Sequence, residues 1–193
     1  MIGIGALAAI ILIIFFVGRG ERIDPNADLL QTQAISLLSI GRIEDAETVL
    51  QDLTQRYQNT RAGKVGLYYL AVVLYHTGRF NESIEFFDKF MGVVKNDYIL
   101  SPSALLGAAS AAEAMRDYNR ALGYYTKLAE DERSPLYEYG VLGQGRMQGL
   151  LGETVKATET LSNLLAKSPS SDVESEARFF LSFFHEQGEQ QLK

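Results

Sequence analysis

Cysteine and tryptophan are absent from this chain of 193 residues, and histidine occurs only twice. Without cysteine the chain has no disulfide scaffold, no thiolate metal site and no cysteine nucleophile. The two histidines, His76 and His185, belong to no His-x-x-x-His, Glu-x-x-His or Ser-His-Asp arrangement. The glycines around Gly143 have the wrong spacing for a dinucleotide loop and follow no strand pattern. The sequence therefore predicts no enzyme, no metal site, no cofactor and no small-molecule substrate.

An excess of basic residues is also missing. Eighteen Lys and Arg residues stand against 24 Asp and Glu residues, which gives a net charge of -6. This balance argues against a phosphate-binding surface, so nucleic acid is not a predicted partner. Hydrophobic residues make up 47% of the chain, which is far more than a disordered protein contains. A packed fold is expected.

Charge is absent altogether from residues 1–18, which are mostly Ile, Leu, Ala, Phe and Val. As a helix this segment would extend roughly 27 Å, close to the thickness of about 30 Å of a membrane's hydrocarbon core. The alternative is a cleaved signal peptide, but no basic region precedes the apolar run and no Ala-x-Ala-like site follows it. We therefore expect an uncleaved transmembrane anchor at 1–18 and a short polar linker at 19–28.

The remaining sequence repeats itself. Four turn-like blocks begin near Gly41, Gly78, Arg116 and Gly152, and each is followed by a large residue and then a small one. The small residues are separated by 37, 38 and 36 positions and are Ala46, Ser83, Ala121 and Ala157. Apolar residues on either side recur at helical spacing, and no alternation typical of strands occurs. The sequence predicts an all-α array with at least eight helices, packed as antiparallel pairs.

The register resembles that of tetratricopeptide repeats. In the second unit the matching residues are Leu67, Leu70, Ala71, Leu74, Gly78, Phe80, Ser83, Phe87 and Phe90. The pattern departs from the family at Ala112, Arg116, Gln148 and Thr154. The resemblance implies a right-handed α-solenoid of about four helix pairs over 29–188, closed by a C-terminal capping helix, with a tail at 189–193.

In that family the ligand usually lies along the concave face formed by the first helix of each pair. Carried onto this sequence, the family pattern places an aromatic and apolar set there: Tyr68, Val72, Tyr75, Leu106, Tyr139 and Leu142. The register turns the three tyrosines away from the core between helices, which suits them to a protein partner. A competing surface is the last helix, with Phe179 and Phe183. Alternatively, a helix or the linker of the same chain fills the groove.

An apolar N-terminal segment followed by a short repeat array resembles the YfgM-like ancillary translocon subunits of bacterial inner membranes. The segments that carry this likeness are 68–71, 86–90 and 100–102. The resemblance implies a single-pass inner-membrane protein with a periplasmic soluble domain, acting as a chaperone-like adaptor or scaffold at a membrane protein complex. Two points stay open. Arg19 and Arg22 favour a cytoplasmic soluble domain by the positive-inside rule, and the protein could instead be a permanent structural accessory subunit.

Overall fold

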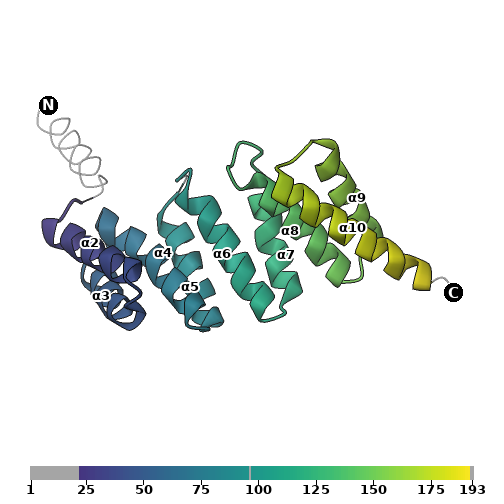
Figure 1. The fold of residues 1–193 in the computed structure, drawn as a ribbon. Helices are drawn as coiled ribbons and strands as arrows, with labels where there is room; N and C mark the ends of the chain where they lie inside the picture. Colours follow the sequence, from purple (N-terminus) through teal and green to yellow (C-terminus); the bar gives the residue numbers. More distant parts are fainter. Residues whose placement is uncertain (1–21, 96, 192–193) are drawn as a thin grey trace, which may run out of the picture. The chain divides into compact units, whose positions relative to one another are not determined.

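The computed structural model describes residues 22–95 and 97–191, and the regular elements of these ranges are all α-helices (Figure 1). They are α2 (Pro25–Ser39), α3 (Ile43–Arg56), α4 (Arg61–His76), α5 (Phe80–Val93), α6 (Leu100–Ala114), α7 (Tyr118–Leu128), α8 (Tyr137–Leu150), α9 (Thr154–Ala166) and α10 (Ser171–Gln191). Short turns join the two helices of each pair. The predicted all-α fold, with four helix pairs and one further helix, is confirmed.

The predicted anchor at 1–18 lies outside the described residues. Among the helices that are described, none combines the length and the apolar character needed to cross a membrane. The transmembrane anchor therefore stays a prediction from the sequence.

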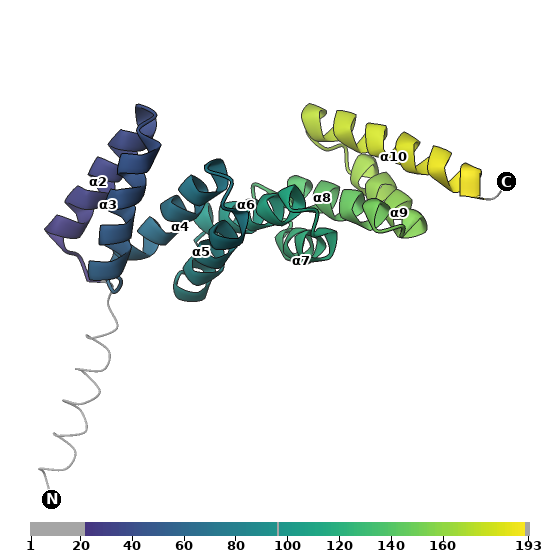
Figure 2. The ribbon, with the colours of Figure 1, turned by 90° about the horizontal axis from the view of Figure 1, so that it is seen from below.

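The chain divides into two compact units, with the boundary after Gly66 inside α4. In the first unit α2 and α3 pack side by side (Figure 2). Helix α2 begins at Pro25, earlier than the predicted linker end, because Asp24 accepts hydrogen bonds from the backbone amides of Asn26 and Ala27. Residues 25–28 are therefore helical, and the predicted linker at 19–28 is too long at its end.

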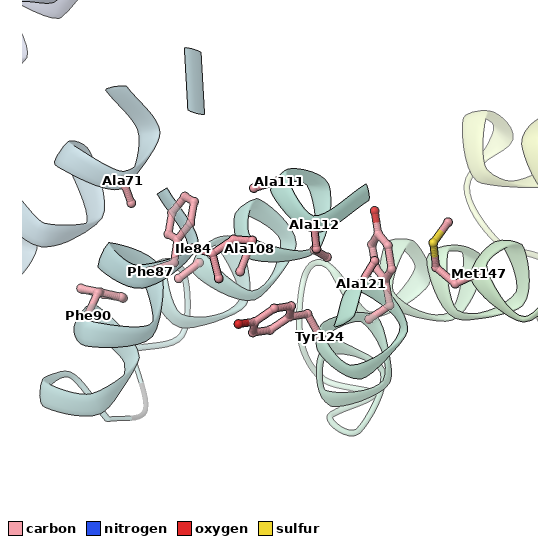
Figure 3. Close-up of a cluster of buried hydrophobic side chains, with 13 residues drawn as sticks. Ala71, Ile84, Phe87, Phe90, Ala108, Ala111, Ala112, Ala121, Tyr124 and Met147 are labelled. Carbon is pink, nitrogen blue, oxygen red and sulfur yellow. The ribbon is translucent and has the colours of Figure 1, made fainter. Parts of the chain in front are cut away.

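The second unit runs from Leu67 and contains the end of α4 and helices α5–α10. From α5 onward, each helix packs against the next along the chain, and α10 also contacts α8. Helix α6 contributes small buried residues to the core, whereas the second helices of the pairs contribute large ones (Figure 3). These buried side chains include Ala108, Ala109, Ala111 and Ala112 from α6, and Phe87, Phe90, Tyr124 and Tyr125 from α5 and α7. Small residues let the helices approach closely enough for the rings to fill the space between them.

Two residues that interrupt the sequence pattern, Gln148 in α8 and Gly188 in α10, both lie within helices. Gln148 occupies a position where the repeat favours an apolar residue, and its Oε1 accepts a hydrogen bond of 2.8 Å from the hydroxyl of Thr160 on α9. This bond satisfies a polar group that is buried between the two helices. Helix α10 continues through Gly188, where the sequence suggested an end, to Gln191.

The turns between paired helices contain one residue that is strained by its backbone conformation. Gly41, Gly78 and Gly152 have φ of 77°, 76° and 83°, and Arg116 occupies the equivalent place with φ 59°. This left-handed region is unfavourable for a residue with a Cβ and costs glycine little. We expect Arg116→Gly to raise the free energy of unfolding by about 0.5–1 kcal/mol, as measured by urea denaturation.

The matched control is Gly78→Ala. A Cβ at Gly78 would meet no heavy atom within 4 Å, so its cost is purely conformational. We expect this variant to be destabilised. If both substitutions left the denaturation midpoint unchanged, the turn conformation would not be a source of strain.

Candidate binding groove

Four of the residues predicted to bind a partner come together on one pocket of the second unit. Tyr68, Val72 and Tyr75 of α4 face Leu106 of α6 across a cavity of about 420 Å³. The other lining residues are His76, Phe87, Ser103, Gly107, Ser110 and Leu136. The cavity thus lies between successive first helices, where the repeat register places it.

Tyr68 and Tyr75, the two tyrosines that line the pocket, also pack against the core. The ring of Tyr68 lies 5.8 Å from that of Phe87 and 5.7 Å from that of Phe90, between centroids. Burial raises the pKa of the Tyr68 hydroxyl, and a hydrogen bond with Ser103 opposes part of this shift. Tyr75 packs against Phe80. The expectation that these tyrosines are free of the inter-helix core is therefore wrong, because the rings of α5 extend beneath them.

Among the described residues, the lining of this pocket contains no Lys, Arg, Asp or Glu. Its polar side-chain groups are the hydroxyls of tyrosine and serine and the imidazole of His76. A surface of this kind favours apolar side chains, because it offers contact area without requiring a charged group to lose its water.

A charged network occupies the first-helix face beyond the pocket. Arg146 of α8 bonds Glu113 of α6 at 2.6 Å and Glu176 of α10 at 2.9 Å. The hydroxyl of Tyr125 donates to the same Glu113 carboxylate at 2.9 Å. The guanidinium carbon also lies 5.6 Å from the centroid of the Phe180 ring. These contacts join α6, α7, α8 and α10, so this stretch of the face is engaged within the chain.

Two further residues predicted for the groove lie elsewhere. Leu142 is only 3% exposed and belongs to a core cluster with Leu161 and Val173, so its side chain offers no surface to a partner. Its place in the groove prediction is corrected on this ground. Tyr139 is 38% exposed, and its hydroxyl donates a 2.6 Å hydrogen bond to Asp172 of α10. It does not line the pocket.

The second predicted surface is exposed on α10. Phe179 is 61% exposed and Phe183 is 39% exposed, and their rings stack with centroids 6.3 Å apart. Phe184, next in sequence, is completely buried against α8 and α9. The last helix therefore has an apolar inner face and a separate aromatic outer face.

The described residues contain no group of three or more histidine, aspartate or glutamate side chains placed to hold a metal ion. Sequence reasoning missed Leu136, which lines the pocket from the segment before α8. A helical register assigns positions only within helices, so it could not place Leu136, which precedes α8, in the pocket.

Residues 32–90 match the model of the tetratricopeptide repeat family. No curated protein sequence matches the chain. Among solved structures, MamA from Desulfovibrio magneticus is 16% identical, with 87% of this chain and 88% of that chain covered and a TM-score of 0.70. A tetratricopeptide repeat protein from Parabacteroides merdae is also 16% identical, with 85% and 62% covered and a TM-score of 0.71. At these identities the likeness to solved structures shows the fold alone. The family match over residues 32–90 indicates a repeat scaffold of the kind that typically carries protein–protein interactions.

Proposed function

We propose that this tetratricopeptide repeat protein is a membrane-anchored adaptor that binds apolar segments of other proteins in the pocket between α4 and α6. The observation that carries the proposal is the convergence of Tyr68, Val72, Tyr75 and Leu106 on one open, uncharged cavity. Aromatic side chains bury a large area and lose little rotamer freedom, which suits them to extended or partly unfolded partners.

The adaptor acts, in this proposal, at a protein complex of the bacterial inner membrane, with its repeats in the periplasm. The uncharged segment 1–18 and the resemblance to YfgM-like translocon subunits support this location. A permanent structural accessory subunit is the second candidate, because a neutral apolar pocket also suits a fixed partner. The two candidates differ in whether the occupant of the pocket changes.

Photocrosslinking tests the groove directly. Benzoylphenylalanine at Val72 in the full-length chain is expected to capture other proteins in cells, whereas the same probe at Asn81, exposed on α5, is not. We expect Tyr75→Ala to weaken capture by about tenfold, since truncating a central aromatic residue costs more than about 1 kcal/mol of binding free energy. Leu106→Asp, which places a charge in the neutral pocket, should have the same effect.

The crosslinked products, identified by mass spectrometry, separate the alternatives. Heterogeneous secreted proteins together with translocon components support the adaptor, and a single partner in fixed stoichiometry supports the accessory subunit. An intramolecular product at Val72 would show that the chain fills its own groove and would overturn both. Thermal denaturation of each variant confirms that a loss of capture does not arise from unfolding.

A further inference from the structure

The last helix, α10, is covered on one side only. Its inner face packs on α8 and α9 through Val173, Ala177 and Phe184, all essentially buried. The preceding first helix, α8, is instead packed between α7 and α9. In the part of the chain that the structure describes, no helix lies over the opposite face of α10 (Figure 2).

This opposite face, here called the outer face, forms one stripe along the helix. Its residues recur at intervals of three and four and are exposed: Ser175, Arg178, Phe179, Ser182, Phe183 and Glu186. Two stacked phenylalanines at the centre of an exposed helix face are unusual for a surface that remains in water.

The order of the charges along the outer face is self-complementary. Arg178 lies at one end of the aromatic pair and Glu186 at the other. When two copies of such a helix run in opposite directions, the arginine of each lies beside the glutamate of the other. Arg178 also bonds Glu174 of its own helix at 2.7 Å, but both side chains are exposed, and surface pairs of this kind are weak and easily exchanged.

The middle of the stripe allows a close approach. Ser182 lies between the two phenylalanines along the stripe, and its small side chain leaves room for the backbone of another helix. Two other carboxylates near this face are already bonded within the chain, since Asp172 accepts from Tyr139 and Glu176 pairs with Arg146. They therefore add little repulsion to the contact.

From this pattern we infer that the outer faces of α10 in two copies of the chain pair antiparallel, crossing at Ser182, to form a symmetric dimer. Each Phe179 packs beside Phe183 of the second copy, and each Arg178 lies near the second copy's Glu186. The contact has two-fold symmetry, so every interaction occurs twice. A pair of single helices buries less than the roughly 1,000 Å² of a stable interface, so the dimer is reversible, with a Kd of about 1–100 µM.

The absence of cysteine allows a position-specific test in the full-length chain in mild detergent. In Ser182→Cys the two thiols meet at the symmetry axis, and mild oxidation is expected to convert most of the protein to a disulfide-linked dimer. In the control, Ser175→Cys, each thiol lies seven residues from the symmetry axis. The two thiols of the dimer are therefore roughly 21 Å apart along the helices. This control should remain monomeric on a non-reducing gel.

A second set of variants tests the side chains that hold the dimer together. Phe179→Ser combined with Phe183→Ser should abolish the Ser182→Cys crosslink. Arg178→Glu and Glu186→Arg should each weaken it severalfold, and the two together should restore it, because the reversed charges again face each other. Circular dichroism of each variant establishes that α10 remains helical.

Three results would overturn the inference. Equal crosslinking at Ser175→Cys and Ser182→Cys would show random collision or association through another part of the chain. A crosslink that survives the loss of both phenylalanines would show that the aromatic contact does not hold the two copies together. Failure of the double charge reversal to restore crosslinking would exclude the antiparallel arrangement. None of these results bears on the pocket between α4 and α6, which is tested at Val72.

Discussion

Phe184→Ala is expected to lower the free energy of unfolding by about 3–5 kcal/mol, whereas Phe183→Ala should change it by less than about 0.5 kcal/mol. Phe184 is completely buried, and its ring lies directly on the backbone of α8 at Gly149, where a Cβ would collide with it. The ring also stacks on Phe180 with centroids 5.9 Å apart. Its removal leaves a cavity that the neighbouring helices do not fill.

The two variants form a matched pair, because they remove the same ring from adjacent positions of one helix. Urea denaturation should be measured at a protein concentration well below that of any self-association, so that Phe183→Ala reports only on folding. Similar losses for both variants would contradict the assignment of inner and outer faces of α10. That result would also remove the basis for dimerisation through the outer face.

The helices could be predicted from the sequence because the information is local. Apolar residues recur at helical spacing within each helix, and the turn residues and the small residues at the crossings recur every 36–38 residues. The start of α2 was missed because the capping side chain of Asp24 acts before the apolar pattern begins. The end of α10 was missed because one glycine costs a helix only about 1 kcal/mol.

The groove could be predicted in part. Tyr68, Val72, Tyr75 and Leu106 follow from the register alone, and the structure brings them to one pocket. Leu142 occupies an equivalent register position, but the packing of α9 and α10 beside α8 buries it. That burial depends on how the last helices close the array, which a repeat pattern does not encode.

The ion pairs of Arg146 were not predicted from the sequence. Its partners, Glu113 and Glu176, lie 33 and 30 residues away along the chain. Each charged residue alone resembles an ordinary solvated side chain. Only the packing of α6, α8 and α10 brings the three together and buries Tyr125 beside them.

This burial predicts a loss of stability at alkaline pH that depends on Tyr125. Loss of water around the ring, together with the negative charge of Glu113, raises the pKa of Tyr125 from 10.0 to about 12. The folded protein therefore keeps the hydroxyl proton to a higher pH than the unfolded chain does. The resulting stabilisation is fully present below pH 10 and is lost as the pH rises from 10 to 12, a total of about 2–3 kcal/mol.

Tyr125→Phe isolates this contribution, because Glu113 keeps its ion pair with Arg146 in the variant. The free energy of unfolding, measured by urea denaturation at several values between pH 9 and 12, should fall more steeply for the wild type than for Tyr125→Phe. The slopes should agree below pH 10. Parallel curves over the whole range would mean that Tyr125 ionises as readily in the folded protein as in the unfolded chain. The carboxylate of Glu113 and the shielding by neighbouring helices would then have no effect on its proton.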